Sequence, residues 1–219
     1  MVALYETVLI EDGRVRLPER HLARLGRAGA HPAVLQAVAE ELTRACRAAE
    51  GPTVIRVDVA ADGAVTSATR APKPTAAVRL LPVAGYDPAD AGRELKRADR
   101  GWAEAPESQA ATARFDEPLL VSDEGLVGET SRANIVAILA DGSLVTPAVR
   151  GLLPGVTRSW VLEQLPVEER ELALIELLEA RAAFLTTSGR GIVRVAAVGG
   201  TPLGDDERIT TLQQAWRAL

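Results

Sequence analysis

The chain has 219 residues, of which 47% are apolar and 25% are charged, the balance of an ordinary soluble globular protein. Its formal net charge of −5 and its pI near 5.2 argue against a general nucleic-acid-binding protein, which normally presents a basic surface. No apolar run reaches the ~18 residues of a membrane span, and the N-terminus lacks the basic start of a signal peptide. One cysteine, Cys46, and two histidines leave little for a disulfide framework or a metal site, so we expect no metal ion and a cytoplasmic location.

Hairpin and helix patterns alternate in the first part of the chain. Four elements are predicted there: a hairpin over residues 3–17 with its turn at Asp12-Gly13, a helix over 17–29, an amphipathic helix over 32–51 and a second hairpin over 53–70. Pro72 and Pro74 then indicate a connector, which is followed by a strand. We therefore expect a small α/β lobe over residues 1–82.

The remaining residues, 83–219, are predicted to form a larger lobe. Its expected elements are an alanine-rich helix after Lys96, hairpins over 117–129 and 133–147, a helix over 154–165, and a helix, strand, loop and strand over 172–200. Helices and strands are mixed without a strict βαβ alternation, so the fold class is α+β.

Lysine is nearly absent from this chain. Of its 25 basic residues only Lys73 and Lys96 are lysines, so 25 − 2 = 23 are arginines. A retained lysine is either a matter of chance or fills a role that arginine cannot, such as forming a Schiff base, because a guanidinium group does not lose its proton. Lys73 lies between prolines and is expected to be solvated. Lys96, within "GRELKRADRGW", has the more structured surroundings and is the candidate.

Three segments carry groups suited to an anion. Gly155, Val156 and Thr157 begin a predicted helix, whose first N–H groups and dipole attract anions, although an ordinary turn with a threonine cap is the alternative. "TTSGRG", residues 186–191, ends a strand with three hydroxyl groups and is either a second phosphate loop or a plain loop. Arg24, on the first helix, is either a ligand or a solvated charge.

The segment "ETSRANI", residues 129–135, packs an acid, two hydroxyls, an arginine and an asparagine at a strand edge that does not require them. Together with "YETVLIEDGRVRLPERHLARL", "GLLPGVTR" and "FLTTSGRGIVRV", it resembles the class IV (fold type IV) pyridoxal-phosphate enzymes. These are the branched-chain aminotransferases, the D-amino-acid aminotransferases and the aminodeoxychorismate lyases. The resemblance covers nearly the whole chain and implies a two-lobed fold in which residues 83–219 form the cofactor-binding lobe.

The resemblance implies a role for each matching position. Lys96 falls where the family has its Schiff-base lysine, which also moves protons as general base and acid. Glu129 matches the acid that pairs with the pyridine nitrogen of pyridoxal 5′-phosphate and so supports its action as an electron sink. The other implied cofactor-binding residues are Arg24, Val156, Thr157 and Ser188 at the phosphate, Gly155 and Thr187 beside them, Leu153 against the ring, and Asn134 as local support.

Two departures from the family pattern bear on the activity. The aromatic residue that follows the lysine in the family is absent, and Asp99-Arg100 looks closer to the polar pair of the lyase branch. The chain also starts almost directly on "LYET", which implies a small lobe that is shortened or completed by a partner. Both features, with the opening segment, favour aminodeoxychorismate lyase.

That lyase converts 4-amino-4-deoxychorismate to pyruvate and 4-aminobenzoate, which is a folate precursor. The resemblance also implies a homodimer. The substrate carries two carboxylates, so its candidate contacts are Tyr5, Thr7, Arg97, Arg100, Arg190 and Arg194. Solvated surface charge is the alternative for at least half of these arginines. A class IV aminotransferase acting on branched-chain or D-amino acids remains open as an activity. A non-catalytic module with the same fold is the third alternative.

Overall fold

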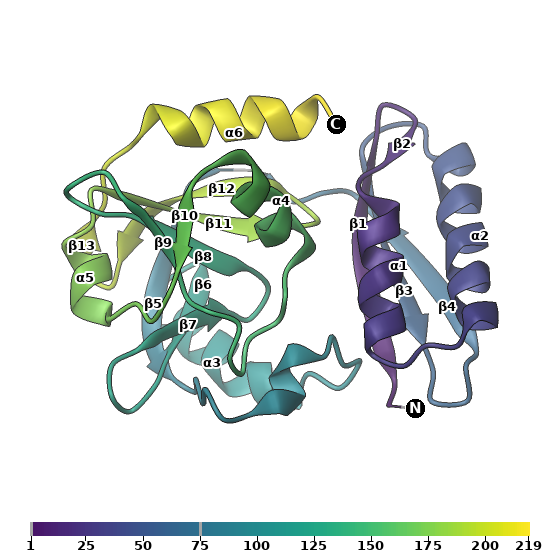
Figure 1. The fold of residues 1–219 in the computed structure, drawn as a ribbon, viewed down its shortest axis with the longest axis horizontal. Helices are drawn as coiled ribbons and strands as arrows, with labels where there is room; N and C mark the ends of the chain where they lie inside the picture. The colour runs from purple at the N-terminus through teal and green to yellow at the C-terminus, as the bar shows by residue number, and fades with distance from the viewer. Residues whose placement is uncertain (1, 75) are drawn as a thin grey trace. The chain divides into compact units, whose positions relative to one another are not determined.

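A computed structural model describes residues 2–74 and 76–219, and the chain divides into two compact units (Figure 1). The first unit contains the chain up to Pro74, together with Leu95–Arg100 and Ser188–Arg190. The second is built from the segment ending at Glu94, from Gly101–Thr187 and from Gly191–Leu219. The first unit thus ends before the predicted boundary at residues 82 and 83. The physical reason is that β5 (Val78–Ala84) pairs with strands of the second unit.

The first unit is an antiparallel sheet with two helices. Its strand order is β2-β1-β3-β4, formed by β1 (Leu4–Glu11), β2 (Arg14–Val15), β3 (Thr53–Val59) and β4 (Val65–Arg70). Asp12 and Gly13 both have positive φ, as a tight hairpin turn requires, which confirms the first predicted hairpin. The helices α1 (Pro18–Arg27) and α2 (Pro32–Ala48) are also confirmed, and α2 ends three residues before Gly51. Leu4, Val8 and Ile10 of β1 belong to the hydrophobic core that includes Val38 and Leu42 of α2.

The second unit contains a nine-stranded mixed sheet in the order β10-β9-β8-β11-β12-β5-β6-β7, with β13 paired to β12. Its other strands are β6 (Glu117–Val121), β7 (Val127–Thr130), β8 (Asn134–Ile138), β9 (Leu144–Thr146), β10 (Val167–Glu169), β11 (Ala182–Thr187), β12 (Gly191–Val198) and β13 (Thr201–Pro202). Its helices are the short 3-10 helix η1 (Ala91–Glu94), α3 (Gly101–Thr112), α4 (Val156–Gln164), α5 (Leu174–Leu178) and α6 (Glu207–Arg217). The predicted hairpins β6–β7 and β8–β9 are confirmed.

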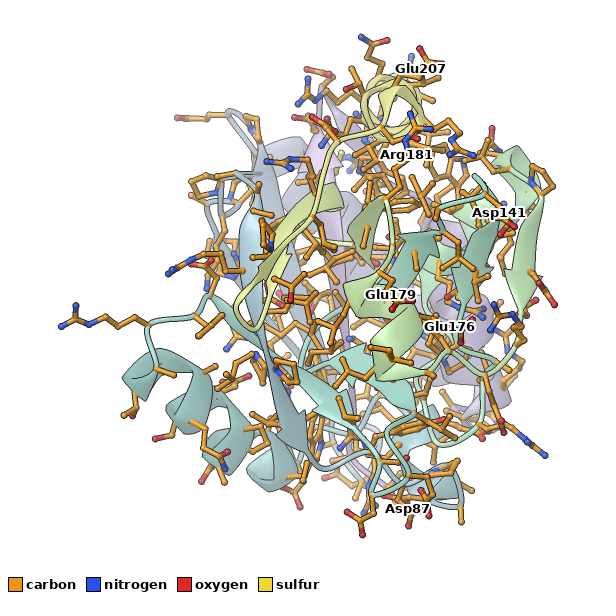
Figure 2. The ribbon with its side chains drawn as sticks, turned by 90° about the vertical axis from the view of Figure 1, so that its left-hand side faces the viewer. Asp87, Asp141, Glu176, Glu179, Arg181 and Glu207 are labelled. Carbon is orange, nitrogen blue, oxygen red and sulfur yellow. The ribbon has the colours of Figure 1, made fainter. Side chains whose placement is uncertain are left out.

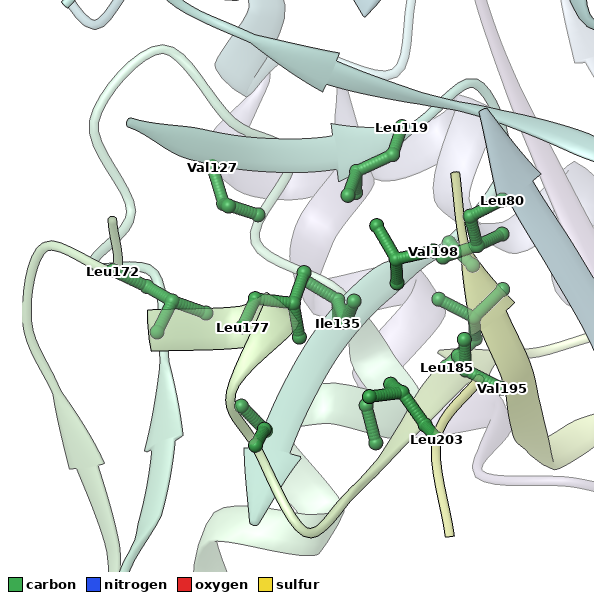
Figure 3. Packing of buried hydrophobic residues seen from close by; sticks show 14 of the residues in the cluster. Leu80, Leu119, Val127, Ile135, Leu172, Leu177, Leu185, Val195, Val198 and Leu203 are labelled. Carbon is green, nitrogen blue, oxygen red and sulfur yellow. The ribbon is translucent and has the colours of Figure 1, made fainter. Parts of the chain in front are cut away.

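The core of the second unit comes from several strands and α5. Leu80, Leu119, Ile135 and Leu185 are fully or almost fully buried, and they gather with Leu177 of α5 in one cluster (Figure 3). The strands that supply them are distant in sequence, so the cluster ties β5, β6, β8 and β11 together. Burial of such side chains contributes roughly 1.5–3 kcal/mol each.

Helix α6 was not anticipated from the sequence, although its signals are present. Asp206 caps the helix by accepting from the Arg208 N–H, and Ile209, Leu212 and Trp216 follow at helical spacing on its buried face. The Trp216 ring meets Trp160 of α4 edge-on, with centroids 5.3 Å apart. Charged side chains such as Asp87, Asp141 and Glu179 lie on the exterior of the unit (Figure 2). None of the helices in the described ranges is long and apolar enough to cross a bilayer.

Candidate active site

Lys96 lies beside β1 in the first unit. Strand β2 pairs only with the end of β1, at Ile10 and Glu11, and therefore leaves the first half of that edge open. The segment around Lys96 fills it: the Tyr5 N–H donates to the Lys96 carbonyl at 2.9 Å, and the Ala98 N–H donates to Ala3 at the same distance. The Lys96 amine lies 4.5 Å from the centre of the Tyr5 ring. The backbone of Lys96 is thus fixed by the edge of the strand that carries Tyr5, whereas Lys73 is exposed, as predicted.

Arginines surround the same tyrosine. The Arg56 guanidinium carbon lies 3.9 Å from the Tyr5 ring centre, and Asp58 holds that guanidinium through hydrogen bonds of 2.6–3.0 Å. Burial raises the pKa of the Tyr5 hydroxyl, although the positive charges of Arg100, Arg56 and Arg24 oppose that rise. Sequence reasoning missed Arg56. Its signal was an arginine inside a β-strand, and the register Thr7↔Arg56 places it beside two predicted substrate residues.

Arg24 is buried in an ion pair and is not a solvated helix charge. Its Nε donates to Glu6 Oε1 at 2.8 Å and its Nη2 donates to Glu6 Oε2 at 2.5 Å. His21 Nδ1 lies 2.7 Å from the same carboxylate, and the three side chains are only 1–6% exposed. This bidentate pair fixes the orientation of the guanidinium.

The cluster of Glu6, His21 and Arg24 combines burial with strong charge pairing. Burial alone would raise the pKa of Glu6, but Arg24 and His21 outweigh it and hold that pKa far below its usual range. Burial lowers the pKa of His21, which the contact with Glu6 only partly offsets. Sequence reasoning did not identify Glu6 or His21. Their signal was an acidic residue at an inward-facing position of a strand and a histidine on the inner side of a helix.

Replacing Arg24 by alanine is expected to lower the free energy of unfolding by about 3–5 kcal/mol at neutral pH, because Glu6 would stay buried without its charged partner. The lowered pKa of wild-type Glu6 contributes stability that is present above its unfolded value of 4.5 and is lost only in strong acid. In the variant, burial raises the pKa of Glu6, so protonation relieves the penalty as the pH falls. Urea unfolding at about pH 7 and about pH 5 should show a deficit that shrinks at the lower pH.

The matched control is Arg44→Ala, which breaks an exposed helix-surface pair with Glu41. It should leave the unfolding curve nearly unchanged at both pH values. An Arg24→Ala deficit as small as that of the control would contradict the assignment of a buried, stabilising pair.

In the second unit, the carboxylate of Glu129 is held from several sides. The Asn134 side-chain amide donates to Oε2 at 2.9 Å, and the Leu153 N–H donates to Oε1 at 3.3 Å. Arg93 Nη2 lies 3.7 Å from Oε1, and its guanidinium stacks on the Trp102 ring at 3.2 Å. Glu129 is 6% exposed. Such an acid is fixed in place and suited to binding one cationic or N–H group.

The start of α4 presents its backbone without a side-chain cap. The N-cap residue is Gly155, so the alternative in which Thr157 caps the helix is wrong. Thr157, 1% exposed, lies in the first turn. Arg158 anchors the same turn by donating to Thr146 Oγ1 at 3.2 Å, to the Pro147 carbonyl at 2.9 Å and to Glu169 at 2.7 Å. A fixed, uncapped helix start is suited to an anion.

The "TTSGRG" segment is divided between the two units. Thr186 and Thr187 end β11 in the second unit, whereas Ser188–Arg190 belong to the first. A Cβ added to Gly189 would lie 3.7 Å from Val54 and 3.8 Å from Thr7, so this loop passes over the sheet of the first unit. Thr186 pairs in register with Asn134, and its buried hydroxyl has no hydrogen-bond partner among residues 2–74 and 76–219.

The predicted substrate arginines have different surroundings. Arg97 is exposed, whereas Arg100 and Arg190, which also belong to the first unit, are partly buried. Arg194 lies on β12 of the second unit, donates to the Gly204 carbonyl at 3.1 Å and faces Asp205 at 4.0 Å. Arg194 is therefore engaged in local structure.

The family model for amino-transferase class IV matches residues 3–198. The chain belongs to this family. Members of the family are enzymes that use pyridoxal 5′-phosphate, which confirms the resemblance and the expected cofactor class. The branched-chain-amino-acid aminotransferase of Pseudomonas aeruginosa is 30% identical over 105 residues, which cover 46% of this chain and 34% of that protein.

Solved structures of the class IV type match nearly the whole chain. A fold IV transaminase from Curtobacterium pusillum aligns with a TM-score of 0.83 at 22% identity, covering 100% of this chain and 87% of its own. The PLP-bound form of a hypothetical aminotransferase from Mycobacterium tuberculosis has a TM-score of 0.83 at 21% identity, with coverages of 98% and 88%. At these identities the likeness establishes the fold, and it confirms the α+β class IV architecture. The chain spans less than half the length of the first curated relatives, at 34%, 30% and 46%.

The donor set of this class IV chain fits pyridoxal phosphate. The second unit offers a fixed carboxylate, an uncapped helix start and the unpartnered Thr186 hydroxyl. The first offers one amine and an oriented guanidinium, Lys96 and Arg24. These are the groups that an aldehyde, a protonatable ring nitrogen and a phosphate require.

Proposed function

We propose that this chain is an aminodeoxychorismate lyase, which converts 4-amino-4-deoxychorismate to 4-aminobenzoate and pyruvate for folate-precursor synthesis. The observation that carries the proposal is the cationic surrounding of Tyr5. The side chains of Lys96 and Arg56 lie over its ring, and the positive charge of Arg100 opposes the rise in the pKa of its hydroxyl. A substrate with two carboxylates and one amine matches two guanidinium groups and one reactive amine gathered around the same tyrosine.

The proposal gives each of these residues a separate role in the reaction. When bound, pyridoxal phosphate supplies an electron sink for the carbon that carries the substrate amine. Lys96 takes the proton from that carbon, the C–O bond on the neighbouring ring carbon breaks, and enolpyruvate leaves while the ring becomes aromatic. The proton held by Lys96 balances the one that enolpyruvate takes up on its methylene carbon to become pyruvate. Arg56 and Arg100 bind carboxylates, and Tyr5 and Thr7 line the substrate. Arg97 and Arg190 remain further candidates for carboxylate contacts.

On the cofactor side, the proposal assigns Glu129 to the ring nitrogen and Leu153 to the ring face. Arg24, Ser188 and the start of α4 bind the phosphate, with Gly155, Val156, Thr157 and Thr187 contributing. Charge-assisted contacts of this kind contribute roughly 1.5–3 kcal/mol each. We further propose that the enzyme acts as a homodimer.

Aminotransferase activity on branched-chain or D-amino acids is the second candidate. It is favoured by the name of the Pseudomonas aeruginosa relative, a branched-chain-amino-acid aminotransferase. The same lysine and acid serve both activities, so the two candidates differ in what happens after the proton leaves the substrate.

A half-reaction experiment separates them. Purified protein loaded with pyridoxal phosphate is given an amino donor alone, and separately 4-amino-4-deoxychorismate. The lyase is expected to accumulate no pyridoxamine phosphate with leucine, glutamate or D-alanine, and to release 4-aminobenzoate and pyruvate in equal amounts. Stoichiometric pyridoxamine phosphate from a donor, with no 4-aminobenzoate, would make the chain an aminotransferase. Lys96→Ala is the control for both arms and should be inactive in each.

A further inference from the structure

We propose that Asn134 is a positioning residue that ties the carboxylate of Glu129 to the start of α4, so that one side chain sets the ring end and the phosphate end of the cofactor site together. The inference rests on the proposed function for the roles of Glu129 and the helix start. Asn134 is the single asparagine of the chain, and it is 6% exposed.

The nitrogen of this amide closes a ring of hydrogen bonds. Nδ2 donates to Glu129 Oε2 at 2.9 Å and to the Leu153 carbonyl at 2.9 Å. The Leu153 N–H in turn donates to Glu129 Oε1 at 3.3 Å. Each of the three residues contacts the other two, so the acid on β7 cannot move without the loop that precedes α4.

The oxygen of the same amide lies against Gly155, the N-cap residue of α4. A Cβ at Gly155 would overlap Asn134 Oδ1 and approach Arg158 Cβ at 3.3 Å. The φ of Gly155 is −68°, which every L-residue adopts without strain. The need for glycine here therefore comes from contact with Asn134 and not from the backbone angle.

Only an amide meets both demands. A side chain at 134 must donate twice with one atom and place a small oxygen against Gly155 with another, and neither a carboxylate nor an aliphatic group does this. A ligand with a ring nitrogen and a phosphate at fixed separation binds best when both partners are held at the matching spacing. Asn134 supplies that spacing within one side chain.

The test compares ligands that carry one end or both. Binding of pyridoxal 5′-phosphate, pyridoxal and inorganic phosphate is measured by calorimetry in a Lys96→Ala background, which removes the covalent contribution. Asn134→Ala is expected to weaken pyridoxal and phosphate by about tenfold each, the scale of one lost hydrogen bond, and the whole cofactor by about a hundredfold. Glu129→Gln should affect mainly pyridoxal, and Thr157→Val mainly phosphate.

Asp206→Ala is the stability-matched control. It removes the cap of α6 and the pair with Arg208, and the carboxylate of Asp206 makes no hydrogen bond to Glu129 or α4 among residues 2–74 and 76–219. All three affinities should remain at the level of the Lys96→Ala parent in this variant. If Asn134→Ala weakens the binding of only one of pyridoxal and inorganic phosphate, or of neither of them, the proposal is overturned.

Gly155→Ala is a second, independent probe, which also serves if Asn134→Ala does not fold. The added methyl pushes Asn134 aside without deleting its hydrogen-bonding groups, so the same loss at both ends is expected. Combining the two substitutions should cost no more than Asn134→Ala alone, because the methyl then meets no oxygen. Fully additive losses would show that the residues act separately.

A Lys96→Ala parent that binds none of the three ligands would overturn the cofactor assignment itself. If the parent binds all three ligands and Asn134→Ala leaves their affinities unchanged, only the present inference is overturned.

Discussion

Lys96→Ala is expected to abolish catalysis, with a fall in turnover of at least about four orders of magnitude. A positioned acid–base group alone contributes up to about 10⁴-fold, and the covalent step is lost as well. Borohydride treatment of the wild type should fix one cofactor per chain on the peptide that contains Lys96, and mass spectrometry reads this directly. The variant should fold normally, because the interactions with β1 run through the backbone of residue 96.

Lys73→Ala is the matched control, since these are the only two lysines of the chain. Lys73 is exposed between prolines, so the variant should retain both the fixed cofactor and full turnover. If Lys96→Ala still takes up cofactor covalently at wild-type stoichiometry, Lys96 is not the attachment site.

Glu129→Gln is expected to lower turnover by at least about a hundredfold, the scale of one well-placed electrostatic stabiliser. The substitution removes the negative charge that would keep the ring nitrogen protonated. It also has a structural effect: both carboxylate oxygens of Glu129 accept hydrogen bonds, and glutamine has only one oxygen to offer. Either the Asn134 amide or the Leu153 N–H loses its acceptor, at a cost of about 1–3 kcal/mol in stability.

The two effects are separated by measuring melting temperature and turnover on the same sample. A catalytic acid predicts that turnover per folded molecule falls about a hundredfold, well beyond any loss of folded protein. A purely structural acid that holds the "ETSRAN" segment predicts early melting with normal turnover per folded molecule. Thr130→Val is a useful control, because Thr130 accepts hydrogen bonds from Arg132 and Ala133 in the same bend without contacting Glu129's carboxylate. It should lose stability but keep its rate.

The local elements and the family could both be predicted from the amino-acid sequence alone. Alternation around Asp12-Gly13 and the helical spacing after Pro18 are local patterns, and they predicted β1, β2 and α1 correctly. The rarity of lysine singled out Lys96, since a guanidinium cannot replace a reactive amine. The polar cluster of "ETSRANI" indicated a function beyond a strand edge, and this segment together with "GLLPGVTR" and "FLTTSGRGIVRV" carried the resemblance to the family.

Which side chains contact one another could not be predicted from the sequence and became known from the folded chain. Glu6 and Arg24 lie in different elements. Neither the alternation of β1 nor the helical spacing of α1 indicates that α1 packs its arginine onto the inward face of β1. The return of Leu95–Arg100 to the edge of β1 depends on β2 being short, which is a property of the assembled sheet. The contact between Asn134 and Gly155 joins a strand to a helix start, and no periodicity encodes it. Local spacing specifies secondary structure, whereas ion pairs and close approaches between distant segments arise only when the whole chain packs.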